Sequence, residues 1–260
     1  MATEMTAERI FHVDALEVRV YADSAALARA AAQAATDWLQ EILRQREEAR
    51  LILASATSQV RFLEALTSAA TLDWSRITVF HMDEYLGLPA DHPASFRRFL
   101  HEHLEARVQP RTIHWIAGDA PEPLKEVARY AALLEAGPID LCCLGIGENG
   151  HIAFNDPPVA DFQDPHLVKL VALDEACRRQ QVGEGWFPDL ASVPAYAYTL
   201  TVPALCRAAR MIAVVPERRK AAAVLDALCG PVSERCPASI LRRHPRATLF
   251  LDRESASLLP

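Results

Sequence analysis

The sequence lacks most features that would suggest a membrane, nucleic-acid-binding or multi-domain protein. Only nine of the 260 residues are Gly, 7% are aromatic, and no repeat, low-complexity tract or Gly/Ser linker divides the chain. The longest apolar runs have the length of a strand, so we expect no membrane-spanning helix and no membrane partner. The formal net charge of −7 argues against a nucleic-acid partner, because such a surface needs a basic face. The composition is typical of a globular enzyme.

Metal-binding patterns are missing too. None of the six Cys residues belongs to a C-x-x-C pair, and no Cys/His cluster has the spacing of a zinc site. His101 and His103 lie two residues apart in a predicted helix, where they do not share a face. We therefore expect no metal and no other cofactor. The polar start of the chain, residues 1–8, is unlike a signal peptide, which predicts a cytoplasmic protein whose cysteines remain thiols.

Strand-like and helix-like segments alternate along the chain, which is the pattern of parallel β-α units. The predicted strands are 16–21, 51–54, 77–81, 139–144, 168–173, 196–202, 211–215 and 247–251. The predicted helices begin at Asp23 or Ser24, after Ser58, at Ser95, at Pro121 and at Lys220. Segments 156–165 and 183–193 are expected to be irregular. We predict one α/β domain over residues 1–260, a doubly wound, open, mostly parallel Rossmann-like sheet with helices on both faces.

A Gly-rich turn carries the most informative side chains. The segment 145–158 follows the predicted buried strand 139–144, and it contains Asn149, His151 and Asp156. A turn directly after a buried strand lies at the carboxyl end of the sheet, where open α/β folds bind ligands. An imidazole next to an acid can move protons near neutral pH. The turn is therefore a candidate catalytic site.

Two adjacent acids follow another buried strand. Asp83 and Glu84 come directly after 77–81. They are either catalytic carboxylates or, in the alternative interpretation, part of a solvated loop in which one of them caps a helix. With His151 on the neighbouring turn, the two strand ends would supply a carboxylate base and an imidazole acid to one cleft. That pair suits proton transfer next to a carbonyl, as in aldose–ketose isomerisation.

Both segments resemble motifs of the glucosamine-6-phosphate deaminase family. The first reads Met82-Asp-Glu-Tyr-Leu-Gly-Leu-Pro, followed by His92-Pro-Ala-Ser-Phe, and the second reads Gly145-Ile-Gly-x-Asn-Gly-His-Ile-Ala-Phe-Asn-x-Pro. The resemblance extends in consistent order from about Val20 to Leu251. The sister family, 6-phosphogluconolactonase, shares the fold, but its corresponding turn usually reads Gly-His-Thr-Ala-Ser-Leu-Phe, which this chain does not match.

The resemblance implies roles for the matching positions. Asp83 corresponds to the residue that moves a proton between C2 and C1 of the opened sugar, and His151 to the residue that assists ring opening. Asn149 stands where members have Asp or Asn. Asp156 stands where Glu is usual, and it is shorter by about 1.4 Å, so we expect a backbone shift or a bridging water. Glu84 and Gly150 are assigned to substrate binding on the same basis.

The expected phosphate site departs from the family pattern. The family has a Thr-Gly-rich loop there, but this chain reads Ser55-Ala-Thr-Ser58 and has no glycine that would allow positive φ. We expect the hydroxyls of Ser55, Thr57 and Ser58 to contact the anion. Lys220 matches the phosphate lysine of the family.

A phosphate arginine of the family has no counterpart at its own position. Gly185, which precedes an aromatic pair, stands there, and Arg178 or Arg179 is a candidate substitute, the alternative being an exposed surface arginine. Val159 and Leu167 replace the Ser and Arg that allosteric members use, and no longer C-terminal tail follows. We therefore expect no response to an effector.

The resemblance predicts an amino-sugar-phosphate deaminase/isomerase that converts glucosamine 6-phosphate to fructose 6-phosphate and ammonia. Its partner is a small-molecule sugar phosphate, and it is expected to be a monomer or small homo-oligomer. Two alternatives remain open at this point. One is a related isomerase or 6-phosphogluconolactonase-like hydrolase with another substrate, and the other is a non-catalytic regulator that binds a sugar phosphate.

Overall fold

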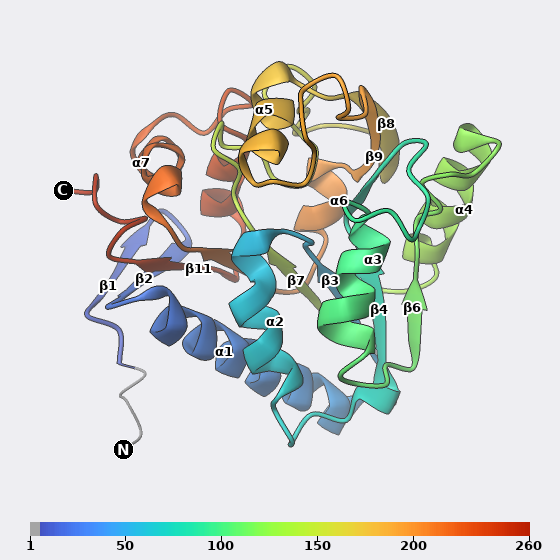
Figure 1. Cartoon of the computed structure of the whole chain (residues 1–260). Helices are drawn as coiled ribbons and strands as arrows, with labels where there is room; N and C mark the ends of the chain where they lie inside the picture. The colour runs from blue at the N-terminus through green and yellow to red at the C-terminus, as the bar shows by residue number, and fades with distance from the viewer. Residues whose placement is uncertain (1–5) are drawn as a thin grey trace.

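The main sheet is open and mostly parallel, as predicted (Figure 1). The structure is a computed structural model that describes residues 6–260, so the first five residues of the polar N-terminal stretch lie outside it. Among the described residues, eight strands form this sheet in the order β1 (Arg9–Val13), β2 (Leu16–Tyr21), β11 (Ala247–Asp252), β10 (Met211–Val215), β7 (Leu141–Leu144), β3 (Ala49–Leu53), β4 (Ile77–His81) and β6 (Thr112–His114). Within residues 6–260, the β1–β2 pair is the only antiparallel pair of this sheet.

Both faces of the main sheet are apolar, because successive side chains of a strand point to opposite faces. In β10, Met211, Ala213 and Val215 join one hydrophobic cluster, while Ile212 and Val214 join the other. The second cluster is covered by α1 (Ser24–Gln45), α2 (Val60–Thr67) and α3 (Phe96–Leu100). The first is covered by α4 (Pro123–Glu135), α6 (Val202–Cys206) and α7 (Ala221–Cys229). Helices on both faces are thus confirmed.

The ends of the helices follow local sequence rules. Asp23 is the N-cap of α1, and its carboxylate accepts a hydrogen bond of 2.8 Å from the backbone N–H of Ala26. Helix α3 starts after Ser95, as predicted, and continues as a short π-helical turn, His101–Glu105. A 3-10 turn, Arg218–Lys220, leads into α7, which ends before Gly230.

A second, smaller sheet was not predicted. It is antiparallel and consists of β5 (Asp83–Tyr85), β9 (Tyr196–Leu200) and β8 (Val168–Ala172). The strands predicted at 168–173 and 196–202 therefore exist, but their expected place in the main sheet is wrong. The central strands of a parallel sheet are buried on both faces, whereas β8 is buried at only two of its five residues. Helix α5 (Glu175–Gly183), also not predicted, lies between β8 and β9 in the chain.

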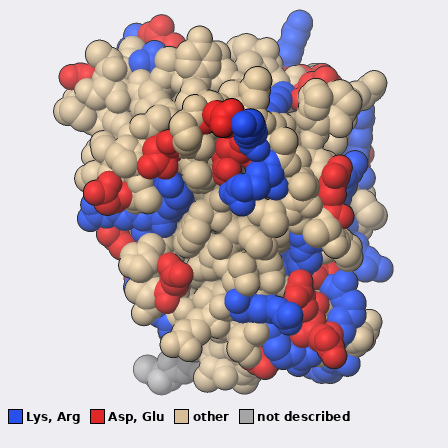
Figure 2. Space-filling model, turned by 90° about the vertical axis from the view of Figure 1, so that its right-hand side faces the viewer, with Lys and Arg blue, Asp and Glu red and all other residues tan. Residues whose placement is uncertain are grey.

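Charged side chains of both signs mix on the surface. On the face shown in Figure 2, Lys and Arg lie among Asp and Glu rather than in one continuous basic area. Within residues 6–260, no helix has both the length and the apolar character needed to cross a membrane.

Candidate active site

Four loops meet at the carboxyl edge of the main sheet. They follow β3, β4, β7 and β10, which are neighbours in the order β10-β7-β3-β4. Because the carboxyl ends of parallel strands lie at one edge, their loops converge there. One pocket is lined by residues from all four loops, including five of the residues proposed from the sequence: Ser55, Ser58, Asp83, His151 and Lys220. Asn149, Asp156, Thr57, Glu84 and Gly150 are not among its lining residues.

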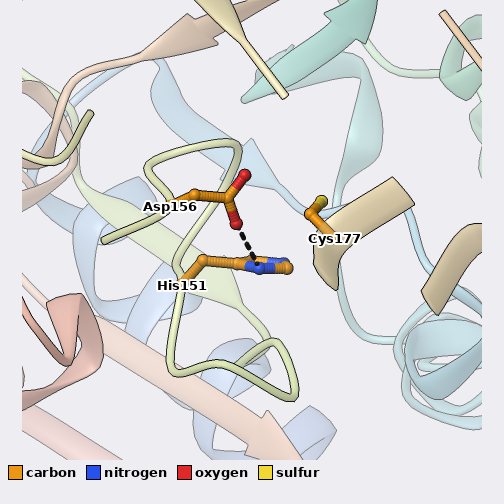
Figure 3. Close-up of side chains that lie close together, drawn as sticks. All are labelled: His151, Asp156 and Cys177. Carbon is orange, nitrogen blue, oxygen red and sulfur yellow. Dashed lines mark ion pairs between the residues drawn. The ribbon is translucent and has the colours of Figure 1, made fainter. Parts of the chain in front are cut away.

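His151 is held by two polar residues that flank it on the turn, Asn149 and Asp156, and Figure 3 shows its pairing with Asp156. Its Nδ1 lies 2.7 Å from Oδ1 of Asn149 and 2.9 Å from Oδ1 of Asp156. The amide of Asn149 also donates to Asp156, at 2.9 Å. A carboxylate beside Nδ1 favours the proton on that nitrogen, which leaves Nε2 as the acceptor. His151 lines the pocket, so Nε2 is the ring nitrogen available to a substrate.

The short side chain of Asp156 reaches the histidine without a bridging water. Its side chain is fully buried, which raises the pKa of the carboxyl. Hydrogen bonds from His151 and Asn149, together with the charge of the imidazolium form, more than offset the effect of burial, and the net pKa of Asp156 is lowered. Asp156 is therefore ionised near neutral pH and orients the imidazole.

Glycines make room for this turn. A Cβ on Gly147 would lie 2.1 Å from Cε1 of His151, so any other residue at this position would displace the ring. Gly150 has a φ of 83°, and a Cβ there would lie 2.7 Å from Sγ of Cys236. Gly150 thus allows the backbone conformation of the turn. Its position does not support the prediction that it contacts the substrate.

Asp83 presents a nearly isolated carboxylate to the pocket. It is the first residue of β5 and is 7% exposed. Burial, followed by the neighbouring charge of Glu84, raises its pKa well above the ordinary value. A buried carboxylate with a raised pKa binds a proton strongly, which is the property that a general base for a C–H proton needs.

Glu84 has the capping role that the sequence left open as an alternative. Its carboxylate is fully buried and accepts hydrogen bonds from Oγ of Ser95 at 2.9 Å, the N–H of Arg97 at 3.0 Å and the N–H of Phe96 at 3.2 Å. Burial raises the pKa of Glu84, and these hydrogen bonds counteract the shift only in part. Glu84 therefore supports the start of α3 and not the pocket. The two adjacent acids have different tasks.

The loop 55–58 is a turn without glycine that leads into α2. Ala56 is extended (φ −156°), Thr57–Gln59 is a 3-10 turn before α2, and none of the residues with positive φ in the described chain falls in this loop. The missing glycine therefore imposes no strain. Within residues 6–260, the hydroxyl of Ser55 is buried without a hydrogen-bond partner. Such a group at a helix start is suited to a bound anion.

Lys220 supplies a buried cation at the same end of the pocket. It is 3% exposed, and burial lowers its pKa. No carboxylate of the described chain lies within ion-pair distance of its Nζ. A buried and unpaired ammonium is unfavourable, so this end of the pocket favours an anionic ligand.

Neither candidate for the missing arginine reaches the pocket. The guanidinium of Arg178 donates to the backbone carbonyls of Leu190 and Val193, and Arg179 pairs with Glu175 on the exposed side of α5. Sequence reasoning instead missed Glu184, which lines the pocket and pairs with Arg219 at 2.9 Å. The two residues are 35 positions apart, and no sequence signal joins them.

One cluster has possible metal ligands, His151, Asp156 and Cys177, whose ligand atoms all lie within 4.8 Å of one another (Figure 3). Burial and the nearby carboxylates raise the pKa of the Cys177 thiol well above its ordinary value. Metals bind the thiolate, so a metal at this cluster would have to displace the proton of Cys177. His101, one of the two His residues that lie two positions apart in the sequence, pairs through Nδ1 with Glu105 at 2.8 Å. That no metal binds stays a prediction.

The fold and motifs agree with comparisons to known proteins. The family model for glucosamine-6-phosphate isomerases/6-phosphogluconolactonase matches residues 22–250. A glucosamine-6-phosphate deaminase of Exiguobacterium sibiricum is 37% identical over 220 residues (85% of each chain), and one of Bacillus cereus is 34% identical over 227 residues (87% of this chain, 84% of the relative).

Solved structures extend the comparison. A monomeric glucosamine-6-phosphate deaminase superposes with a TM-score of 0.85 at 31% identity, covering 93% of this chain and 99% of that one. The 6-phosphogluconolactonase of Thermotoga maritima, at 19% identity and a TM-score of 0.74 over 90% of this chain and 98% of its own, shares the fold. On the family match over most of its length, the chain belongs to the glucosamine-6-phosphate isomerase/6-phosphogluconolactonase family.

Proposed function

We propose that the protein is a metal-independent glucosamine-6-phosphate deaminase that forms fructose 6-phosphate and ammonia. One observation carries the proposal: a buried carboxylate, Asp83, and an oriented imidazole, His151, line the same pocket as a buried cation, Lys220. The 34–37% identity to glucosamine-6-phosphate deaminases supports it. The lactonase likeness is at the level of fold.

Ring opening is the first step. The phosphate binds Lys220 and the loop 55–58, which directs the sugar ring toward His151 and Asp83. Nε2 of His151 accepts the proton of the O1 hydroxyl and returns a proton to the ring oxygen as the C1–O5 bond breaks. Asp156 stabilises the imidazolium that forms between the two transfers, because its carboxylate lies 2.9 Å from Nδ1.

Proton transfer and loss of ammonia follow. Asp83 removes the proton from C2 of the open-chain aldehyde, and that electron pair forms a C1=C2 double bond. The π electrons of the C1=O bond move to O1, which takes up a proton from the ammonium group at C2, and the product is an enolamine. The protonated Asp83 then returns a proton to C1, which leaves an imine at C2. Water hydrolyses the imine to the ketone and ammonia. The raised pKa of Asp83 suits it to hold the proton between the two carbons.

We further infer that the enzyme works in the cytoplasm as a monomer or small homo-oligomer, without a nucleic-acid or membrane partner. All six cysteines are free in the described structure, which suits a reducing compartment. The structure of a monomeric deaminase that covers 93% of this chain supports the small assembly.

A substrate panel tests the proposed function. The purified protein is incubated with glucosamine 6-phosphate, free glucosamine or 6-phosphogluconolactone, and ammonia, fructose 6-phosphate and lactone hydrolysis are measured. We expect equal amounts of ammonia and fructose 6-phosphate from the first compound alone. Lactone hydrolysis without ammonia release would favour the hydrolase alternative, and binding of the sugar phosphate without any turnover would favour the regulator.

A further inference from the structure

The carboxylate of Glu184 accepts hydrogen bonds from a set of donors that could also bind a phosphate group. Its Oε1 accepts hydrogen bonds from Nε2 of Gln180 at 2.8 Å and from the guanidinium of Arg219 at 2.9 Å. Its Oε2 accepts from Nε1 of Trp186 at 3.3 Å and from Oγ1 of Thr57 at 3.4 Å. The Glu184 side chain is only 5% exposed. Several donors around one buried anionic group are what a phosphate site provides.

Glu184 also lies between the two parts of the expected phosphate site. Thr57 belongs to the loop before α2, and Arg219 directly precedes Lys220 on the turn before α7. The charge of Glu184 acts on Lys220, whose pKa it raises against the larger, lowering effect of burial. Two polar groups of this end, Ser55 Oγ and Lys220 Nζ, keep no hydrogen-bond or ion-pair partner within residues 6–260.

The charges at this end do not suit a phosphate as long as Glu184 stays in place. Arg219 contacts three carboxylates: Glu184, Glu217 at 2.6 Å and Glu148 at 3.4 Å. Arg219 is not a lining residue of the pocket, whereas Glu184 is. A phosphate next to Glu184 would be repelled, and it would be separated from the guanidinium. Displacement of Glu184 would expose Arg219, Thr57 and Lys220 to the same ligand.

We propose that Arg219 is a phosphate-binding residue of this site and that Glu184 is its internal counter-ion, which the phosphate of the substrate displaces. The inference rests on the proposed function, because the phosphate is that of the sugar substrate. It explains how a chain with Gly185 in place of the expected arginine binds phosphate: the second cation comes from the turn before α7, where Arg219 contacts Glu184. Glu184 keeps that cation paired when no ligand is bound.

Calorimetric titration with inorganic phosphate tests the inference without turnover. Arg219→Gln removes a charge-assisted hydrogen bond, and we expect it to weaken phosphate binding about 10- to 100-fold. Glu184→Gln keeps the shape but removes the competing charge, and we expect it to tighten binding about fivefold or more. Arg218→Gln is the matched control. Arg218 lies on the same turn, is 76% exposed and is 3.9 Å from Glu254, so its loss should change the affinity less than about twofold.

Steady-state kinetics give a second readout. Arg219→Gln should raise KM for glucosamine 6-phosphate with a much smaller effect on kcat, and Arg219→Lys should restore part of the affinity. Equal affinities for phosphate in Arg219→Gln and Arg218→Gln, or no gain in Glu184→Gln, would overturn the inference. The inference would also be overturned if the wild type bound free glucosamine more tightly than glucosamine 6-phosphate, because Glu184 would then contact the sugar itself.

The two proposals fail in different ways. If the wild type releases ammonia from glucosamine 6-phosphate but phosphate affinity does not depend on Arg219, the role of Arg219 is refuted and the deaminase assignment remains. If phosphate binding depends on Arg219 and Glu184 as expected but no ammonia is released, the deaminase assignment is refuted and the phosphate site remains. Thermal unfolding of each variant verifies that it is folded before titration.

Discussion

The carboxylate of Asp156 contacts Nδ1 of His151 directly, at 2.9 Å, although the family resemblance implies a longer Glu at this position. The turn between the two residues brings them together without help from a water molecule. Asp156 is fully buried and its pKa is nevertheless lowered, since burial is outweighed by His151 and Asn149. The imidazole is thus oriented by an ionised acid.

Replacement of Asp156 by Asn should affect both catalysis and stability. We expect kcat to fall by about tenfold or more, because the imidazolium loses its counter-charge. The folded-state pKa of Asp156 is below its unfolded value, so its contribution to stability is present above the unfolded pKa and disappears as the pH falls through the folded pKa. Thermal melts should therefore show Asp156→Asn destabilised at pH 7 and equal to wild type at strongly acidic pH.

Asp164 provides the control for that prediction. Burial raises its pKa, but pairing with Lys169 at 2.8 Å lowers it overall, and Asp164 does not line the pocket. Asp164→Asn should lose stability with the same sign of pH dependence while kcat stays near the wild-type value. A comparable loss of kcat in both variants would mean that Asp156 acts through general stability alone.

The contact between Gly147 and the His151 ring gives a steric test. Gly147→Ala would put a methyl group 2.1 Å from Cε1 of His151, so the ring must move. A displacement of about 1 Å can lower catalysis by about 10²-fold, and we expect a loss of that order in kcat. Gly183→Ala, where a Cβ meets no heavy atom within 4 Å, should keep full activity. Activity of Gly147→Ala near the wild-type level would show that the ring position is not critical.

The buried charge of Asp83 should reduce stability. Burial and Glu84 raise the folded-state pKa of Asp83 well above its unfolded value, so the folded protein loses stability as the pH rises between these two values. Asp83→Asn removes this penalty. Its melting temperature should exceed that of the wild type at pH 8, and the difference should vanish below the unfolded pKa. An Asp83→Asn variant that is less stable at pH 8 would indicate that the carboxylate has a stabilising partner.

Kinetics should be hyperbolic and unaffected by N-acetylglucosamine 6-phosphate. Val159 and Leu167 replace the polar groups of an effector site, and the nearby Lys169 is already engaged by Asp164 at 2.8 Å and by the carbonyl of Val159 at 2.7 Å. Allostery needs a second site with different affinities in two states. Initial rates measured with and without this compound should coincide. Sigmoidal curves that the compound makes hyperbolic would contradict this expectation.

The sequence predicted those parts of the fold and site that depend on local patterns. Buried strands such as 211–215 are continuous apolar runs, and the candidate catalytic residues Asp83 and His151 lie on segments that follow such runs. Their meeting in one pocket follows from the parallel sheet, because neighbouring strands end at one edge.

Features that depend on long-range contacts were not predictable. The pairing of β5 with β9 joins residues 83–85 to 197–199, and neither segment encodes its partner. Glu84 acts as a cap because it accepts hydrogen bonds from N–H groups of α3. Glu184 forms an ion pair with Arg219, which lies 35 residues away in the sequence. The glycine-free loop at Ser55 adopts negative φ throughout, which composition alone did not indicate.

The central claim, that Asp83 carries the proton from C2 to C1, is tested most directly with C2-deuterated glucosamine 6-phosphate. NMR follows the loss of deuterium from C2 in the wild type and in Asp83→Asn, while ammonia is measured in parallel. We expect the wild type to lose the label together with ammonia release, and Asp83→Asn to lose it at least about 10²-fold more slowly. Loss of the label at equal rates in both proteins would contradict the role of Asp83.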